Sequence, residues 1–169
     1  FDYAVQSRVL VVTDVAIEEP QAVAAAYRSL IEASGGGALG LFTSIRRLRD
    51  VHARIAARLE AAGLPLYAQH VDALDPGTLV DFFREEENAS LFGTDAMRDG
   101  VDVPGRSLRL VVFDRVPWPR PDILHKARAK GLGIAKYNDV IVRLRLAQAF
   151  GRLIRRADDR GVFVILGAA

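Results

Sequence analysis

The sequence predicts an α/β domain in which a largely parallel sheet is covered by helices on both faces. Short apolar runs alternate along the chain with longer segments of helical periodicity. Since neighbouring parallel strands need long crossover connections, this alternation is typical of a parallel sheet. The runs at 38–42 and 161–166 are apolar at nearly every position, as expected for strands buried on both faces. The length of 169 residues suits one domain with a substantial core.

The early elements are marked by the residues at their ends. Pro20 begins the first long helix, a position where its fixed backbone angle is favourable. The glycines 35–37 are interpreted as a helix stop and a flexible turn. Ser44 is placed to cap the next helix, which Gly63 ends. Strands are expected at 8–13, 38–42 and 64–68, and helices over 20–33, 44–62 and 78–86.

The later elements follow from longer apolar patterns. Strands are expected at 89–93, 108–116 and 161–166, with a long helix over 137–156. The helix has an apolar face made of Val142, Leu146, Ala149 and Leu153. The proline-rich run 117–121 is expected to be an extended connector, and its Trp118 is interpreted as a packing residue rather than a base-stacking one.

Composition excludes several classes of protein. The chain has no cysteine, which removes disulfides and thiolate metal sites, and its three histidines lack the spacing of a metal site. No apolar run reaches the roughly 18–20 residues that span a bilayer, so we expect no membrane contact and a cytoplasmic location. The net charge of +2 hides a basic segment, 120–160, with 11 Lys and Arg against 4 Asp and Glu. An anionic partner is expected there.

Polar residues follow several predicted strands, where parallel sheets usually bind ligands. Thr43 and Ser44 follow 38–42, and Gly93 and Thr94 end 89–93. The turn segment 99–102, which carries two aspartates, is expected at the same edge. Capping and turn formation are the alternative explanations of these residues. The glycines 35–37 precede a strand, which is the reverse of a phosphate-binding loop, and no Gly-x-x-x-x-Gly-Lys-Ser/Thr motif occurs.

An arginine stripe on the long helix is the most informative feature. In a helix, Arg145, Gln148, Arg152 and Arg155 share one face, with no acidic neighbour at helical contact spacing. Guanidinium groups bind phosphates well, so a nucleotide phosphate is the leading partner, and solvated surface is the alternative. Gly151 beside Arg152 suggests the close approach of another backbone or of a ligand.

Three motifs, taken in order, resemble the second RecA-like domain of a DinG/XPD-type superfamily 2 DNA helicase. Leu41-Phe42-Thr43-Ser44 looks like motif IV. Leu91-Phe92-Gly93-Thr94, with Asp99-Gly-Val-Asp-Val-Pro-Gly105, looks like motif V. Gln148-Ala-Phe-Gly-Arg-Leu-Ile-Arg155, with Asp159-Arg-Gly161, looks like motif VI, the most specific of the three.

The resemblance implies a RecA-like three-layer domain that works in a larger machine. Residues 1–169 would form one C-terminal helicase domain, with 1–16 as the lead-in from a preceding domain. ATP would bind between two RecA-like domains, and the first of these would hold most of the ATP and the Mg²⁺. Many such helicases carry an iron–sulfur cluster in their other part, and none is expected in this chain. The partners would be single-stranded DNA, travelled 5′ to 3′, and the first RecA-like domain.

The resemblance also implies roles for particular residues. Arg152 and Arg155 would meet the ATP phosphates, and Gln148 would position the nucleotide and its attacking water. Asp102 would approach the nucleotide, with Gly100 permitting the turn. The DNA backbone would be contacted by Thr43, Ser44 and Thr94. The isolated chain is expected to hydrolyse no ATP.

Two other functions stay open at this stage. One is a non-catalytic nucleic-acid-binding module with a helicase-like fold. The other is an unrelated small-molecule-binding α/β domain. A neighbouring P-loop would argue against the first, and salt-dependent binding of single strands would argue against the second.

Overall fold

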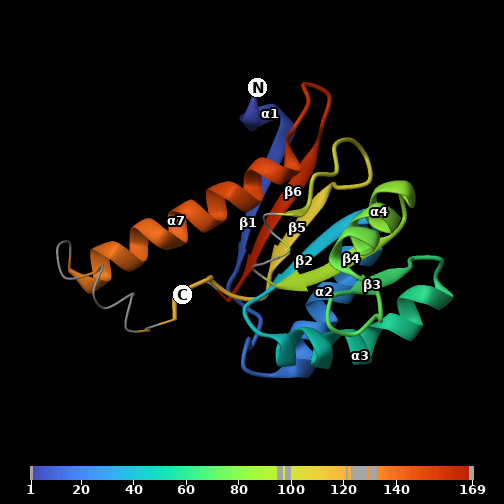
Figure 1. Cartoon of the computed structure of the whole chain (residues 1–169), viewed down its shortest axis with the longest axis horizontal. Coiled ribbons are helices and arrows are strands. Elements are labelled where there is room, and N and C mark those ends of the chain that lie inside the picture. The colour runs from blue at the N-terminus through green and yellow to red at the C-terminus, as the bar shows by residue number, and fades with distance from the viewer. Residues whose placement is uncertain are drawn as a thin grey trace.

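The computed structural model describes residues 2–94, 97, 100–120, 122, 129 and 133–167. Within them the chain forms one parallel sheet in the order β1-β6-β5-β2-β4-β3 (Figure 1). The strands are β1 Ser7–Val12, β2 Ala38–Phe42, β3 Leu66–Ala68, β4 Ser90–Thr94, β5 Leu110–Phe113 and β6 Gly161–Leu166. The helices are α1 Tyr3–Gln6, α2 Pro20–Ser34, α3 Ile45–Ala61, α4 Pro76–Glu85 and α7 Ile134–Leu153. The predicted parallel α/β class is therefore confirmed.

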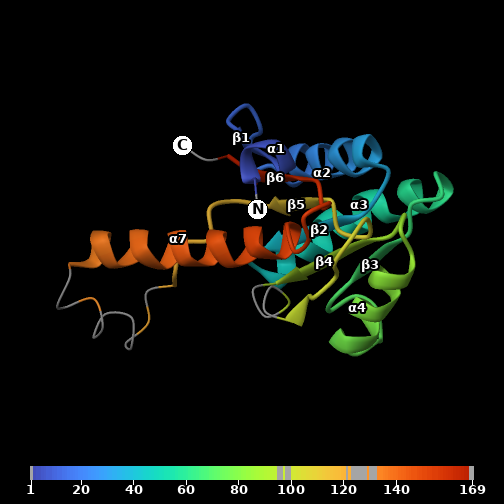
Figure 2. The ribbon, with the colours of Figure 1, turned by 90° about the horizontal axis from the view of Figure 1, so that it is seen from above.

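Two apolar layers lie on opposite faces of the sheet. One joins the strands to α4 and α7 through residues such as Leu79, Phe83 and Leu153. The other joins them to α2 and α3 through residues such as Tyr27 and Leu48. Figure 2 shows α4 and α7 on one side of the strands and α2 on the other. This is the expected three-layer arrangement, in which each helix buries one stripe.

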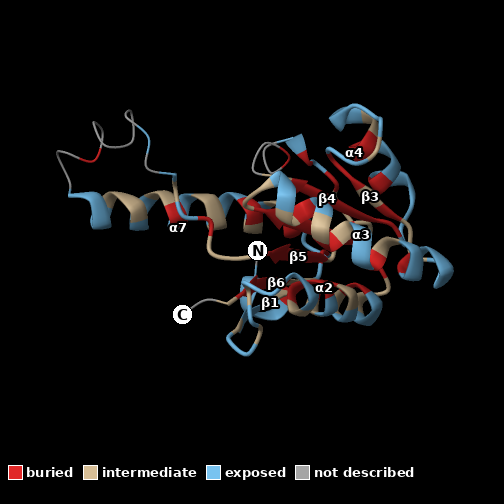
Figure 3. Cartoon of the chain, turned by 90° about the horizontal axis from the view of Figure 1, so that it is seen from below, coloured by how far each residue is buried: buried red, intermediate tan, exposed pale blue. Residues whose placement is uncertain are grey.

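Strands β2 to β6 are largely buried, whereas the edge strand β1 and much of α7 are exposed. Figure 3 shows buried residues along the strands, while α7 extends beyond the sheet. On α7 the residues Val142, Ala149 and Leu153 are buried and Leu146 packs against the core, so the predicted apolar face is confirmed. No helix in the described part of the chain is long and apolar enough to cross a membrane.

Several element boundaries differ from the prediction. The helix expected over 137–156 is Ile134–Leu153, and the strand expected at 108–116 is only Leu110–Phe113. The next residue, Asp114, still donates its backbone N–H to the Leu41 carbonyl of β2 at 3.1 Å, and its carboxylate binds Thr43 and Arg47. The short helix α1 was not predicted. Within the expected lead-in 1–16, β1 pairs along its length with β6 and forms an edge of the sheet.

The glycine turn after α2 is held rather than flexible. Gly35 ends the helix in the left-handed conformation with φ 65°, which confirms the predicted helix stop. The guanidinium of Arg109, just before β5, donates to the carbonyls of Ser34 at 2.9 Å and Glu87 at 2.8 Å. It also donates to the Gly35 carbonyl. Arg109 thus fastens the turn at the edge where the strands begin.

Candidate functional site

The residues predicted to bind ligands fall into two groups, one at the carboxyl ends of the strands and one at their amino ends. Thr43 directly follows β2, and Thr94 is the last residue of β4. These strands are neighbours, with Phe42 paired to Thr94. The expectation that these residues gather at the carboxyl ends of the strands is confirmed. We call Thr43, Ser44, Gln69, Thr94 and Asp114 the strand-end cluster.

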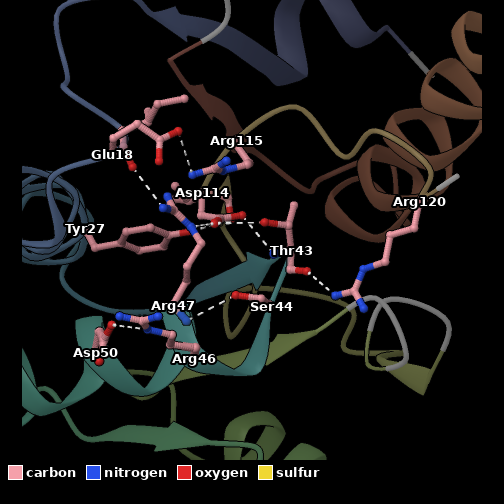
Figure 4. A network of polar contacts seen from close by, with 12 residues as sticks. Glu18, Tyr27, Thr43, Ser44, Arg46, Arg47, Asp50, Asp114, Arg115 and Arg120 are labelled. Atoms are coloured by element: carbon pink, nitrogen blue, oxygen red, sulfur yellow. Dashed lines mark hydrogen bonds and ion pairs between the residues drawn. The ribbon is translucent and has the colours of Figure 1, made fainter.

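Asp114 is the centre of this cluster, and its side chain is fully buried (Figure 4). Its Oδ1 accepts the backbone N–H of Thr43 at 2.9 Å, and its Oδ2 accepts the Thr43 hydroxyl at 3.2 Å. The Nε of Arg47, from the first turn of α3, donates to the same Oδ2. Burial raises the pKa of Asp114 above its ordinary value, while the hydrogen bond and charge of Arg47 lower it. The carboxylate therefore depends on Arg47 to compensate its lost hydration.

Arg47 is itself anchored inside the domain. Its Nη1 donates to the carbonyl of Ile17 at 2.9 Å. Nearby, the Tyr27 hydroxyl donates to the carbonyl of Val112 at 3.1 Å. Burial, assisted by the charge of Asp114, raises the pKa of Tyr27 well above its ordinary value, so the phenol stays neutral. Arg47 is consequently a structural partner of Asp114 rather than a group presented to solvent.

Ser44 caps α3 as predicted. Its Oγ accepts the backbone N–H of Arg47 at 3.3 Å. Beside it, the exposed guanidinium of Arg120 donates through Nη2 to the carbonyl of Thr43 at 3.2 Å (Figure 4). The Ser44 hydroxyl, which faces Arg47, and the Arg120 guanidinium, which binds the Thr43 carbonyl, thus both lie near the end of β2.

Gln69 holds the second threonine in the same manner. It follows β3 and is buried, and its Oε1 accepts both the backbone N–H and the hydroxyl of Thr94, each at 3.0 Å. Its own backbone N–H donates to the carbonyl of Phe92 at 2.9 Å. The end of β4 is therefore fixed by a side chain from its neighbouring strand.

The arginine stripe is confirmed only in part. Arg145 and Gln148 lie on α7 together with Arg152, but the helix ends at Leu153 and Arg155 lies beyond it. The helix ends there because Ile154 is extended, and because the Asp159 carboxylate accepts the backbone N–H groups of Arg155 and Arg156 at 2.7 Å each.

The turn that carries Arg155 is tied to the start of the chain. The amide nitrogen of Gln6, the last residue of α1, donates to the carbonyls of Arg156 at 3.0 Å and Asp159 at 3.2 Å. Both Gln6 and Asp159 are buried. The stripe's first member, Arg145, is partly buried and donates to the carbonyl of Pro117 at 3.0 Å. Arg145, Gln148 and Arg152 thus keep the helical spacing of one face, while Arg155 lies beyond the helix.

Arg155 forms an ion pair with Asp102, which lies 53 residues earlier in the sequence. Its Nη2 donates to Oδ1 of Asp102 at 2.7 Å, and both side chains are substantially exposed. The backbone carbonyl of Asp102 accepts from Arg84, in the last turn of α4, at 3.3 Å. Because α4 returns to the edge where β4 begins, Asp102 lies at that edge. The sequence predicts Asp102 at the carboxyl ends of the strands, with Thr43 and Thr94, and this prediction is wrong.

Three glycine and tryptophan predictions also need correction. Gly100 has no left-handed backbone, and a side-chain carbon there would meet no atom within 4 Å, so nothing described requires glycine for a turn. The same open space surrounds Gly151, so no backbone among the described residues approaches it closely, and the approach of a ligand stays a prediction. Trp118 is 58% exposed and so is not a core packing residue. Asp99 lies outside the described residues.

Sequence reasoning missed three residues that organise these two regions, Arg47, Gln69 and Asp114, and it named Asp159 within motif VI without a role. Asp114 gave a signal, because it is the one carboxylate in the apolar run 108–116. Gln69 stands directly after a predicted strand, as Thr43 does, and could have been found by the same rule. No group of three or more His, Cys, Asp or Glu within the described residues could hold a metal ion.

The sequence of the chain matches one protein family over most of its length. The sequence model of the helicase C-terminal domain family matches residues 27–168. The chain therefore belongs to the helicase C-terminal domain family. The predicted resemblance to DinG/XPD-type helicases is confirmed by its relatives. The ATP-dependent helicase DinG of Mycobacterium tuberculosis is 43% identical over 144 residues, which is 81% of this chain and 21% of that protein.

A second relative and one solved structure are also similar to the chain. The ATP-dependent DNA helicase YoaA of Escherichia coli is 34% identical over 178 residues, which is 98% of this chain and 27% of that protein. The solved structure of an XPD helicase matches with a TM-score of 0.71 over 95% of this chain and 31% of that one. At 19% identity, this match shows the RecA-like fold alone. The chain spans about a quarter or less of the curated relatives it matches.

Proposed function

We propose that the chain is the second motor domain of an ATP-dependent DNA helicase that moves 5′ to 3′ along single-stranded DNA. The observation that carries this proposal is the contact between Arg155 and Asp102, because it joins the motif VI and motif V segments at one edge. Arg152 lies three residues earlier, near the end of α7. The strand-end cluster lies at the other end of the strands, so nucleotide and DNA would bind to separate regions of the domain.

We call Arg152, Arg155 and Asp102 the arginine edge, and this region suits a nucleotide phosphate. The Arg155 guanidinium already binds an anionic oxygen, the Oδ1 of Asp102 at 2.7 Å, and phosphate oxygens accept in the same geometry. Because the pair is exposed, exchanging the carboxylate for a phosphate costs little burial. Arg152 and Arg155 would hold phosphate oxygens, Gln148 would orient the nucleotide and water, and Asp102 with Gly100 would approach from the motif V side.

The chemistry that these arginines supply is electrostatic. Phosphoryl transfer needs positive charge where negative charge develops, and an arginine from a second domain is worth about 10³–10⁵ in rate. Mg²⁺ and most of the ATP would be held by the first RecA-like domain, which would be this chain's main partner. Closure of the two domains would bring Arg152 and Arg155 to the phosphates. An iron–sulfur cluster would belong to another part of such an enzyme.

The strand-end cluster suits the backbone of single-stranded DNA. Thr43, Ser44 and Thr94 lie where two adjacent strands end, with the Arg120 guanidinium beside them. Opening and closing of the nucleotide cleft would shift this cluster relative to the other domain and advance the DNA. A cytoplasmic location is part of the same proposal.

The test is a comparison of the isolated chain with a protein that also contains its P-loop domain. We expect no ATP turnover from residues 1–169, and DNA-stimulated turnover from the larger protein. We expect the larger protein to unwind a duplex with a 5′ single-stranded tail and not one with a 3′ tail. Turnover by the isolated chain would contradict the proposed division of labour. Salt-dependent binding of single strands without turnover in the larger protein would instead favour a non-catalytic binding module.

A further inference from the structure

We propose that Asp114 and Gln69 are positioning residues for the DNA backbone, and that Ser44 and Arg120, rather than the two threonine hydroxyls, donate to its phosphates. This inference rests on the proposed DNA-binding role of the strand-end cluster. It concerns which atoms of that cluster remain available as donors.

Thr43 and Thr94 are held by matching arrangements. Each threonine gives both its backbone N–H and its hydroxyl to one buried side chain from an adjacent strand end, Asp114 or Gln69, over distances of 2.9 to 3.2 Å. Asp114 has no exposed side-chain surface, and Gln69 is 9% exposed. The two ends of β2 and β4 are therefore fixed by the protein before any ligand arrives.

The direction of each hydroxyl proton decides which groups can donate a hydrogen bond to a phosphate. A carboxylate oxygen and an amide carbonyl oxygen only accept hydrogen bonds, so each threonine hydroxyl must direct its single proton inward. The identity of the Gln69 atom is secure, because the backbone N–H of Thr94 needs an acceptor there. Phosphate oxygens are acceptors too. Neither Thr43 nor Thr94 can therefore donate to a phosphate while these bonds persist.

Two other groups at this edge retain donors. The Ser44 oxygen accepts the N–H of Arg47 at 3.3 Å, which leaves its own proton undirected within the described part of the chain. Arg120 is exposed and uses Nη2 on the Thr43 carbonyl, while a guanidinium has five N–H groups. Arg47, by contrast, uses Nε on Asp114 and Nη1 on Ile17, and its remaining Nη2 is buried. The phosphate-binding pair at the end of β2 is thus Ser44 with Arg120.

The experiment measures binding of a fluorescent oligothymidine to the full chain by anisotropy over a range of salt concentrations. Ser44→Gly removes the hydroxyl while glycine still serves as a helix cap, and it should weaken binding about tenfold. Thr43→Val and Thr94→Val keep the side-chain shape and should each change binding less than about threefold. Losses from either valine variant as large as that from Ser44→Gly would overturn the inference.

Variants of Arg120 and Gln69 distinguish a residue that contacts phosphate from one that only positions its neighbours. Arg120→Ala should reduce the slope of log affinity against log salt by about 0.7, as expected for one phosphate contact on a single strand. Arg106→Ala is the charge-matched control, since Arg106 pairs with Glu87 at 2.8 Å near the edge where the strands begin, and it should leave the slope unchanged. Gln69→Leu should weaken binding several-fold at unchanged slope.

The outcomes also separate this inference from the proposed function. Absence of salt-dependent binding by the unmodified chain would contradict the DNA-binding role itself. Normal binding by the unmodified chain, with an unchanged slope in Arg120→Ala or unweakened binding in Gln69→Leu, would contradict only the assignment of donors and positioning residues.

Discussion

The two edges of the sheet differ in how complete they are. In the strand-end cluster, Thr43 and Thr94 are each bound by a buried acceptor, Asp114 or Gln69. At the other edge, Arg155 binds an exposed carboxylate, that of Asp102, and only the backbone of its turn is fixed, by Asp159. One region is preorganised within the chain, while the other has a fixed frame and exchangeable charges. This difference fits the proposed function, in which one region binds DNA and the other meets a nucleotide when the cleft closes.

The largest expected effect tests the arginine edge. In a protein that carries both motor domains, Arg152→Ala should lower ATP turnover by about 10³–10⁵-fold, or roughly 4–7 kcal/mol, because transition-state charge loses its partner. DNA binding should stay within about threefold, since the strand-end cluster is untouched. Steady-state turnover and anisotropy on the same preparation provide the measurement.

Arg143→Ala is the matched control for Arg152. Arg143 lies on the same helix, is exposed, and pairs with Asp139 at 2.8 Å. Its removal should leave turnover nearly unchanged. An equal loss of turnover and of DNA binding in Arg152→Ala would mean that Arg152 supports the fold instead, and the contrast between the two edges would fail.

The second prediction concerns the strength of the preorganised edge. Arg47→Ala should destabilise the chain by about 3–5 kcal/mol, because it leaves the fully buried Asp114 carboxylate without its cation. The neighbouring Arg46 is the control, since its side chain is 91% exposed and it lies 3.9 Å from Asp50. Arg46→Ala should cost less than about 1 kcal/mol. Urea unfolding with a constant m-value measures both, and equal effects would show that the Asp114 carboxylate does not depend on Arg47.

The strands and most helices could be predicted because their signals are local. The run 38–42 and the run 161–166 are apolar throughout, and β2 and β6 have those bounds. Ser44 was found as a cap because an N-cap residue acts only on its own helix. The gathering of Thr43 with Thr94 needed one general rule, that parallel strands end at one edge.

The remaining features depend on strand order and on side chains far apart in sequence. Asp114 reaches Thr43 because β5 lies beside β2, and Gln69 reaches Thr94 because β3 lies beside β4. Strand order cannot be read from hydrophobic periodicity. The end of α7 was missed for a similar reason, since Asp159 takes the N–H groups of Arg155 and Arg156 that a longer helix would have used.

The smallest expected effect decides whether the arginine edge is exchangeable. Arg155 and Asp102 lie 2.7 Å apart, with side chains 38% and 60% exposed. A double-mutant cycle of Arg155→Ala and Asp102→Ala, measured by urea unfolding of the full chain, should give a coupling below about 1 kcal/mol. A phosphate could replace the Asp102 carboxylate at little cost if the coupling free energy is that small. A coupling above about 2 kcal/mol would make the pair a structural lock, because a nucleotide would then have to break a stabilising contact before Arg155 could bind it.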